Sequence, residues 1–508
     1  MKRNLYKIHR TLGILALIPV LVWTASGFMH PFMTWFKPKQ PQTVTIPQAV
    51  KFETVKIGID SILKINNIAT IKQVRFIQAN EKTYYQVKLP KQQELLYFDV
   101  SNGEKWQNGD KLYAEQLARY FIDEQKNAVA SNTIVTEFSK NYKSVYKLLP
   151  VYEVKFQRDD NVRVYVETEL SRIGTVIDDR RETFTWIFNN LHNWEFINFN
   201  ETFRVSFLML VMTICFCSAL SGLFVYGIFY KKFHPNAVTH RKFHRNLGIT
   251  VSVAMLGFSF SGAFHAFQKL TPDDRFKYIY EPEIQVNNLP NFQKFQEIIA
   301  KYNPKNDVGN LFFAKIDKEY LLCLSHYDGK KATPIHTDFV QIANQTNLDG
   351  GCMTYASFIA DKFFVQKYIN CKPENEQKGG DCCETNEVAD IANDKIAPAI
   401  PKISATNYVD KFEKEYGFFN KRLPVVKVAY ETEGNKRLYV EYATGKLAAA
   451  IENKQALEGI SFAYLHKYHL FEFLGKNTRD IIMMCFALGN FVVASLGMVM
   501  LLKRINMK

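Results

Sequence analysis

The sequence predicts an α-helical membrane protein with four transmembrane helices in two parallel repeats, plus α+β domains outside the cytoplasm. Three observations lead to this fold class. Four apolar runs are long enough to cross a bilayer, basic residues flank each run on one side, and short motifs of the first half recur in the second. The average composition, 47% hydrophobic and 22% charged, conceals this division into very apolar and very polar stretches.

The four apolar runs carry no formal charge over at least the roughly 20 residues that a membrane-spanning helix needs. We place the transmembrane helices at residues 11–36, 203–230, 247–267 and 481–502, and the charge-free part of the second begins at residue 205. A cleavable signal peptide is the alternative for the first run. That run is too long for the apolar region of a signal peptide, and Pro31 and Trp35 stand where small residues are needed for cleavage. We therefore interpret it as a retained anchor.

The basic residues beside the runs give the orientation. Residues 1–10, 231–246 and 503–508 are rich in Lys and Arg, so the positive-inside rule predicts that these segments are cytoplasmic. The long segments 37–202 and 268–480 then lie outside, in the periplasm. We expect a multi-pass protein of the bacterial inner membrane with cytoplasmic N- and C-termini. The net charge is +14, but the basic residues cluster beside the membrane or are scattered along strands. We therefore expect the lipid bilayer as a partner and no nucleic acid.

Short motifs recur at two constant spacings. The first, 235 residues, carries HRTLGI onto HRNLGI and aligns His9 with His244, Ser26 with Ser261, Gly27 with Gly262, and His30 with His265. The second, 274 residues, carries NVRVYVE at 161–167 onto NKRLYVE at 435–441 and His192 onto His466. The 39-residue difference predicts an insertion in the second copy around residues 340–395. Since both copies run in the same direction, we expect them to be related by an axis near the membrane normal.

The segments between the runs have the patterns of small α+β domains. Alternating residues interrupted by turn residues predict three hairpins, at 83–89 with 94–100, 151–156 with 162–167, and 425–431 with 437–442. Helical spacing at 49–64 and 405–416 predicts helices that pack on these sheets.

The order of these motifs resembles that of a known family. An HRxxG start, a Ser-Gly near the outer end of the first helix, a Tyr-Val strand with a Thr-Gly turn (Tyr439-Val440, Thr444-Gly445) and a Leu-His before the return helix resemble the PepSY-associated transmembrane family. The resemblance covers nearly the whole chain except the cysteine-bearing insertion. It implies PepSY-like outer domains and a haem-dependent oxidoreductase that reduces ferric iron or a ferric siderophore outside the cytoplasm for iron uptake. A quinol or another cytoplasmic-side donor would supply the electrons.

Six of the eleven histidines occupy repeated positions: His9, His30, His192, His244, His265 and His466. Ionisable residues in membrane spans are functional candidates, and neutral imidazole is a good axial ligand of haem iron inside a helix bundle. Small residues let a flat macrocycle approach a helix, a role predicted for Gly13, Gly27, Gly248 and Gly262. Arg10 and Arg245 are predicted to pair with propionates. The alternative is that the histidines cap helix ends and the glycines serve only helix packing.

The six histidines divide into two layers. His9 and His30 are about 31 Å apart along a helix at 1.5 Å per residue, so they cannot bind one iron. We predict two haem b groups, one near each membrane face, held non-covalently because the chain has no CxxCH motif. The outer pairing stays open between His30 with His265 and a pairing in which each copy uses its own Leu-His histidine. Zinc is a weaker alternative ligand, since no HExxH motif is present.

The remaining motifs favour no other chemistry. No catalytic triad, phosphate loop or dinucleotide fingerprint stands out, which is typical of an electron carrier. The alternative from another class is a non-enzymatic PepSY membrane module that binds a peptide or a periplasmic protease. A transporter is disfavoured because the spans lack buried carboxylates. In the second outer segment we predict at least one disulfide among Cys352, Cys371, Cys382 and Cys383.

Overall fold

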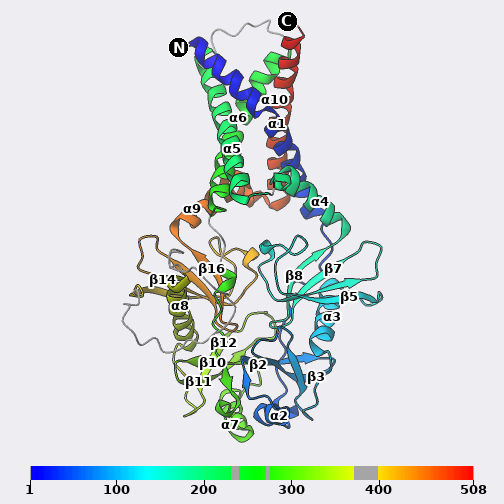
Figure 1. Cartoon of the computed structure of the whole chain (residues 1–508), viewed down its shortest axis with the longest axis vertical. Coiled ribbons are helices and arrows are strands. Elements are labelled where there is room, and N and C mark those ends of the chain that lie inside the picture. The colour runs from blue at the N-terminus through cyan, green and yellow to red at the C-terminus, as the bar shows by residue number, and fades with distance from the viewer. Residues whose placement is uncertain (1, 198, 230–238, 271–274, 371–398, 507–508) are drawn as a thin grey trace, which may run out of the picture.

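The computed structural model describes residues 2–197, 199–229, 239–270, 275–370 and 399–506 (Figure 1). Within these residues, four helices are long and apolar enough to cross a membrane. They are α1 (Lys2–Trp35), α5 (Glu201–Phe229), α6 (Thr239–Gln268) and α10 (Lys476–Ile505). The four predicted spans lie almost entirely within them, which agrees with a multi-pass membrane protein. The helices extend past the apolar runs because their polar ends continue the helical hydrogen bonding beyond the bilayer core.

The four helices form a closed bundle. Helix α1 contacts α5 and α10, and α6 contacts the same two helices. The first and last described residues lie at one end of this bundle and the soluble domains at the other (Figure 1). We call these the terminal end and the domain end. We also call residues 2–229 the first half and 239–506 the second half.

The soluble domain of the first half packs one helix between two antiparallel sheets. Its elements are α2 (Ile59–Ile65), β2 (Gln73–Ala79), β3 (Lys82–Lys88), β4 (Leu96–Asp99), α3 (Gly109–Ile122), β5 (Val129–Val135), β6 (Val151–Phe156), β7 (Arg163–Glu167), β8 (Arg172–Ile177) and α4 (Asp179–Leu191). The sheets have the orders β2-β3-β4 and β5-β6-β7-β8. Leu117 and Phe121 of α3 are buried in a core with Val154 and Val164 of the four-stranded sheet.

The soluble domain of the second half has the same order of elements. They are α7 (Phe292–Tyr302), β10 (Val308–Ile316), β11 (Glu319–His326), β12 (His336–Gln341), α8 (Gly351–Asn370), β13 (Ile403–Val409), β14 (Val425–Tyr430), β15 (Arg437–Glu441), β16 (Lys446–Ile451) and α9 (Asn453–Ser461). The sheets have the orders β10-β11-β12 and β13-β14-β15-β16. Helix α8 packs between them, with Tyr355 and Ile359 in the buried core.

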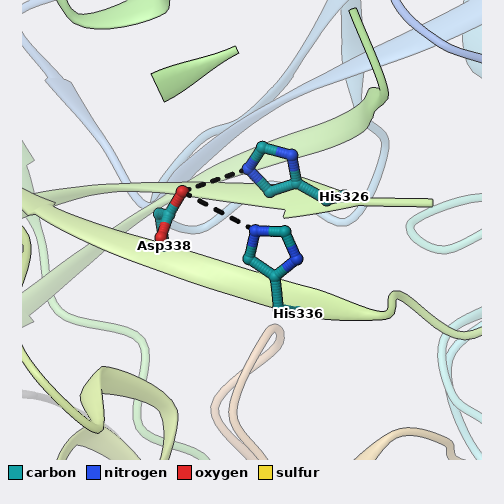
Figure 2. Close-up of side chains that lie close together, drawn as sticks. All are labelled: His326, His336 and Asp338. Atoms are coloured by element: carbon teal, nitrogen blue, oxygen red, sulfur yellow. Dashed lines mark hydrogen bonds and ion pairs between the residues drawn. The ribbon is translucent and has the colours of Figure 1, made fainter. Parts of the chain in front are cut away.

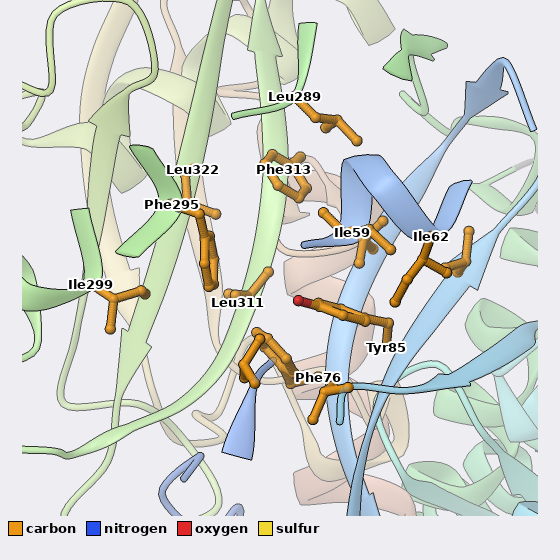
Figure 3. Close-up of a cluster of buried hydrophobic side chains, with 14 of the residues drawn as sticks. Ile59, Ile62, Phe76, Tyr85, Leu289, Phe295, Ile299, Leu311, Phe313 and Leu322 are labelled. Carbon is orange, nitrogen blue, oxygen red and sulfur yellow. The ribbon is translucent and has the colours of Figure 1, made fainter. Parts of the chain in front are cut away.

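The two halves share one hydrophobic core (Figure 3), which lies beside α2 and α7 at the end of the molecule opposite to the bundle (Figure 1). Phe76 and Tyr85 come from the first half, and Phe295, Leu311 and Phe313 from the second. Strand β2 lies beside β10. The short strand β1 (Thr70–Ile71) also pairs with β9 (Ile284–Gln285) across the halves. Because neither half covers these side chains alone, the two soluble domains form one body.

The structure confirms the three predicted hairpins, which correspond to β3–β4, β6–β7 and β14–β15. The two predicted helices are wrong in whole or in part. Residues 405–416 begin in strand β13, because Thr406 and Val409 pair with β14 and pairing decides the conformation of a short ambiguous segment. In 49–64, the α-helix begins only at Ile59. The Val50 amide donates to the Val308 carbonyl instead of starting a helix, and Phe52–Thr54 form only a single 3-10 turn.

Most of the extra length of the second half falls in and after α8, which has 20 residues against 14 in α3. The first half has six residues between α3 and β5, whereas residues 371–402 separate α8 from β13. Cys371, Cys382 and Cys383 lie outside the described residues. Cys352 on α8 is a free thiol. The predicted disulfide among the remaining three cysteines therefore stays a prediction.

Candidate functional site

At the terminal end, a histidine of each half is held by the other membrane helix of that half. His9 Nδ1 on α1 lies 3.2 Å from the Ser218 carbonyl oxygen and 3.1 Å from Ser221 Oγ, both on α5. His244 Nδ1 on α6 lies 3.0 Å from the Val493 carbonyl oxygen on α10. A carbonyl can only accept, so Nδ1 carries the proton in both rings and Nε2 keeps its lone pair.

Small residues border both of these imidazoles. A Cβ on Gly222 would lie 3.0 Å from His9 Cε1, and a Cβ on Gly497 would lie 3.8 Å from His244 Cε1. The predicted Gly13 faces Ser218 Oγ, 3.9 Å from its ideal Cβ. Its counterpart Gly248 faces Val493 at the same distance. The backbone therefore approaches each of these contacts closely.

The predicted arginines lie next to these histidines in the sequence. Arg10 is exposed on α1. Arg245 is half-buried on α6 and its Nε donates to Asn246 Oδ1 at 3.3 Å. Both side chains therefore sit at the terminal end of the bundle, as their predicted role with propionates requires.

At the domain end, the Leu-His histidines reach back to the Ser-Gly motifs. His192 caps α4, and its Nδ1 lies 3.1 Å from Ser26 Oγ. His466 ends the π-helical turn Phe462–His466 that follows α9, and its Nδ1 lies 3.2 Å from Ser261 Oγ. The Trp23 indole also donates to the His192 carbonyl at 3.0 Å. The two motifs that recur in the sequence thus meet in space within each half.

The serine hydroxyls fix the tautomer of these two rings. Ser26 Oγ donates to the Val22 carbonyl at 2.8 Å, and Ser261 Oγ donates to the Gly257 carbonyl at 2.6 Å. Each hydroxyl has only one hydrogen, so while it donates to its helix carbonyl its oxygen accepts the proton of Nδ1. Nε2 of His192 and His466 is therefore left as the unprotonated nitrogen, which is the form that binds a metal.

The glycines of these motifs leave room beside the rings. A Cβ on Gly27 would lie 3.8 Å from His192 Cε1, and a Cβ on Gly262 would lie 3.9 Å from His466 Cε1. Burial, together with the neighbouring His30, lowers the pKa of His192 to about 4. Burial also lowers the pKa of His466 well below its ordinary value, with a further contribution from His192. Both imidazoles are therefore neutral at physiological pH.

Six aromatic rings form a row across the domain end. His192 and His466 meet at its centre, with ring centroids 6.3 Å apart and planes at 86°. Phe188 stacks on His192 at 4.5 Å and lies 5.6 Å from His30. Phe462 stacks on His466 at 4.6 Å and on His265 at 4.5 Å. His30 and His265 thus stand at the two ends of the row.

The outer histidines therefore differ in their surroundings. His192 and His466 are the pair in direct ring contact, whereas a phenylalanine separates His30 and His265 from the histidine of their own half. His265 Nδ1 also lies 2.8 Å from Glu458 Oε1 on α9. Sequence reasoning missed Phe188 and Phe462. Their spacing of 274 residues, the same as that of His192 and His466, could have identified them.

A large cavity of about 2960 Å³ lies between the domain end of the bundle and the soluble domains. His30 and His265 line it. Both halves also contribute cationic side chains to its wall, namely Lys37, Arg75, Lys143, Arg172, Arg181, Lys269, Arg275, Lys414, Lys421, Lys436, Lys467 and Lys476. Burial and the neighbouring Arg181 lower the pKa of Lys421 to about 7. Glutamates such as Glu195 and Glu458 also line the cavity, so its wall carries both signs of charge with basic side chains in excess, and it reaches the ring row.

Comparisons with known proteins add no relative: no family model matches the chain, and no curated protein matches it.

Proposed function

We propose that this chain is a haem-carrying membrane reductase of the PepSY-associated kind. It transfers electrons from a quinol or another donor at the terminal end to ferric iron or a ferric siderophore at the domain end. The observation that carries this proposal is the chemistry of the histidines. Imidazoles at both ends of one membrane bundle have Nδ1 bonded within the protein and Nε2 left to bind a metal.

The proposed orientation in the membrane follows from the positions of the basic segments. The terminal end carries the basic segments, so it is the cytoplasmic side of the bacterial inner membrane, and the soluble domains are PepSY-like periplasmic domains. The common order of elements in the two halves supports a pair of parallel repeats related by an axis along the bundle.

The domain-end ligands are proposed to be His192 and His466. Their ring centroids lie 6.3 Å apart, so these two imidazoles would hold the haem iron between the halves. Both rings also offer the correct nitrogen. His9 and His244 take the same role at the terminal end, where Arg10 and Arg245 are available for propionates.

A haem held at each end supplies one-electron redox chemistry. The residues of the chain then have three tasks. The serines and backbone carbonyls keep Nδ1 protonated and orient the rings. The glycines leave space beside the ligands. The apolar helices keep water and protons away from the membrane interior.

The cavity is the proposed binding chamber for the ferric substrate. Its volume of about 2960 Å³ exceeds the 300–1,000 Å³ typical of small-molecule pockets, so it admits a bulky chelate. Its lysines and arginines favour anionic oxygen-rich ligands, which are the groups that hold ferric iron. Since His30 and His265 belong both to the wall and to the ring row, a substrate in the chamber lies beside the proposed redox centre.

The decisive measurement is the absorption spectrum of the detergent-purified protein, expressed with ample haem. We expect a Soret band and the low-spin reduced spectrum of two axial imidazoles. His192→Ala or His466→Ala should remove the domain-end haem, while His240→Ala, a change at a partly exposed histidine in the first turn of α6, should leave the spectrum unchanged. If His30→Ala and His265→Ala remove that haem instead, the outer ligands are His30 and His265.

A wild-type protein without a Soret band contradicts the whole proposal. The non-enzymatic module that binds a peptide or a periplasmic protease then becomes the better interpretation, with the large cavity as its peptide site. Reduction of a ferric chelate in the presence of a colorimetric Fe²⁺ chelator separates the two further, because a peptide-binding module has no reason to produce Fe²⁺.

A further inference from the structure

A second group of histidines lies in the soluble domain of the second half, away from the bundle (Figure 2). His326 ends β11, and His336 begins β12 directly opposite it. Asp338 lies two residues further along β12 and points to the same face. One ligand atom of each of these residues lies within 4.8 Å of the others. The two imidazoles stack at 4.0 Å, and Asp338 Oδ2 lies 3.2 Å from His326 Nε2.

Other polar side chains orient this group from outside. Asp307 Oδ1 lies 2.6 Å from His326 Nδ1, so the carboxylate accepts the Nδ1 proton and directs Nε2 toward Asp338. Asn347 Nδ2 donates to Asp338 Oδ1 at 2.7 Å and leaves Oδ2 facing the imidazoles. A carboxylate that holds the far nitrogen of a histidine is the usual support of a metal ligand.

The first half shows that the fold does not need these polar residues. Leu89 stands seven residues after the first residue of β3, as His326 does in β11. Leu96 pairs with the fifth residue after the start of β3, as Asp338 does with β11. Both leucines pack against the shared hydrophobic core. The equivalent sheet position is therefore stable with apolar side chains, and the histidine group must serve something other than packing.

We propose that His326, His336 and Asp338 bind one divalent transition-metal ion. Two imidazoles and one carboxylate suit Zn²⁺ or Fe²⁺, because these ions accept mixed nitrogen and oxygen ligands. Asp307 and Asn347 orient the ligands. The His336 side chain is 53% exposed, so the ion is reached from solvent and keeps coordination positions for water or another ligand. Ion pairs with two aspartates would explain His326, but they would give His336 only a long contact from its Nε2 to Asp338 Oδ2, at 3.9 Å.

The test uses the full-length protein in detergent, purified without a polyhistidine tag and stripped of metal by a chelator. Titration with Zn²⁺, and separately with Fe²⁺ without oxygen, is followed by calorimetry. We expect one binding equivalent that His336→Ala and the double variant His326→Leu/Asp338→Leu both lose. The leucines are the residues of the first half, so the double variant keeps the sheet. His240→Ala is the matched control and should keep every equivalent.

The variant Asp307→Asn separates a role in metal binding from a purely structural role, because only the first predicts a change in metal affinity without a change in fold. It should weaken metal affinity about 10- to 100-fold while the far-ultraviolet circular dichroism stays unchanged. Zn²⁺ should raise the melting temperature of the wild type but not that of His336→Ala. Binding of neither ion by the wild type, or an undiminished number of equivalents in His336→Ala, overturns the proposal. Neither outcome depends on haem.

Discussion

Ser26 and Ser261 show how one hydroxyl determines which nitrogen a histidine offers. Each donates its hydrogen along its own helix and accepts the Nδ1 proton of a histidine from another element. Without this acceptor, an imidazole can place its proton on either nitrogen or turn away from the site. The serines thus position the proposed ligands without touching the metal.

The first prediction concerns Ser261. Ser261→Ala should weaken haem retention at the domain end about 10-fold or more, because loss of an outer-shell partner has that effect on ligand affinity. Haem content per protein and the midpoint potential measure it. Ser259→Ala is the matched control, since Ser259 is buried on the same helix but bonds only its own backbone, at 2.6 and 3.4 Å. Equal spectra for the two variants would contradict the positioning role.

A buried group of charges joins the two soluble domains. Glu441 of β15 accepts from Arg172 of the first half at 2.5 Å and from Arg422 at 2.7 Å. Lys446 reaches Glu169 across the same boundary at 2.8 Å. Removing one member of a buried ion pair leaves its partners uncompensated in a medium of low polarity.

The second prediction concerns this group. Glu441→Gln should lower the free energy of unfolding by about 3–5 kcal/mol, because Arg172 and Arg422 each lose one buried counter-charge and must share Glu167. The Glu182→Gln control removes a half-exposed partner of Arg163 and should cost less than about 1 kcal/mol. Thermal unfolding in detergent measures both. Similar losses in the two variants would show that the buried pairing adds nothing.

The third prediction is a pH dependence of the same residue. Burial alone raises the pKa of Glu441, but Arg172 and Arg422 outweigh it and lower that pKa to about 2. The folded pKa lies below the unfolded value of about 4.3, so the stabilisation is complete above that pH and is lost as the pH falls toward 2. The difference in stability between wild type and Glu441→Gln should therefore shrink between these pH values. A constant difference would contradict the assignment.

At the scale of elements, the membrane helices were the most predictable part of the fold. A charge-free run of this length has few alternatives, and flanking charges mark its ends. The hairpins were predictable because alternation and turn residues are local. Strand β13 was not, because its conformation depends on pairing with β14, which the local spacing does not contain.

Some residues of the candidate site could likewise be predicted from the sequence and others could not. Six histidines were found from the constant spacing of the repeats. Phe188 and Phe462 follow the same spacing but were overlooked because aromatic side chains are common in such segments. His326 and His336 had no counterpart in the first half, so comparison of the halves could not reveal them. Their proximity results from the register of β11 and β12.

The fourth prediction concerns the packing of α1 on α5. Gly222→Val should displace His9, because even a Cβ at this position lies 3.0 Å from its Cε1. Haem retention at the terminal end should fall about 10-fold or more, while the domain-end haem remains. Gly227→Val on the same helix is the control, since no atom lies within 4 Å of its ideal Cβ. Unchanged haem content in Gly222→Val would contradict the role of His9.

At the scale of the whole molecule, the first and second halves contact each other in two separate regions. In the membrane α1 contacts α10 and α5 contacts α6, and far from the membrane the shared core joins the soluble domains. Each half alone therefore exposes a large apolar surface.

The fifth prediction follows from this double contact. Residues 1–235 and 236–508, expressed separately, should each aggregate or be degraded, and their co-expression should restore a one-to-one complex. Size-exclusion chromatography in detergent measures this. The variant Phe313→Asp should abolish the complex, because it places an uncompensated charge in the shared core, whereas Asp317→Asn at the exposed β10–β11 turn should not. A monodisperse half on its own would contradict the prediction.

The two contacts between the halves, in the bundle and in the shared core, also limit access to the large cavity. The bundle closes one side of it and the shared core closes the opposite side, so the two halves surround it like a ring. If the two halves swung apart to open the cavity, they would have to break either the contacts in the bundle or those in the shared core. While both sets of contacts hold, any molecule that enters the cavity must therefore pass between the two halves from the side.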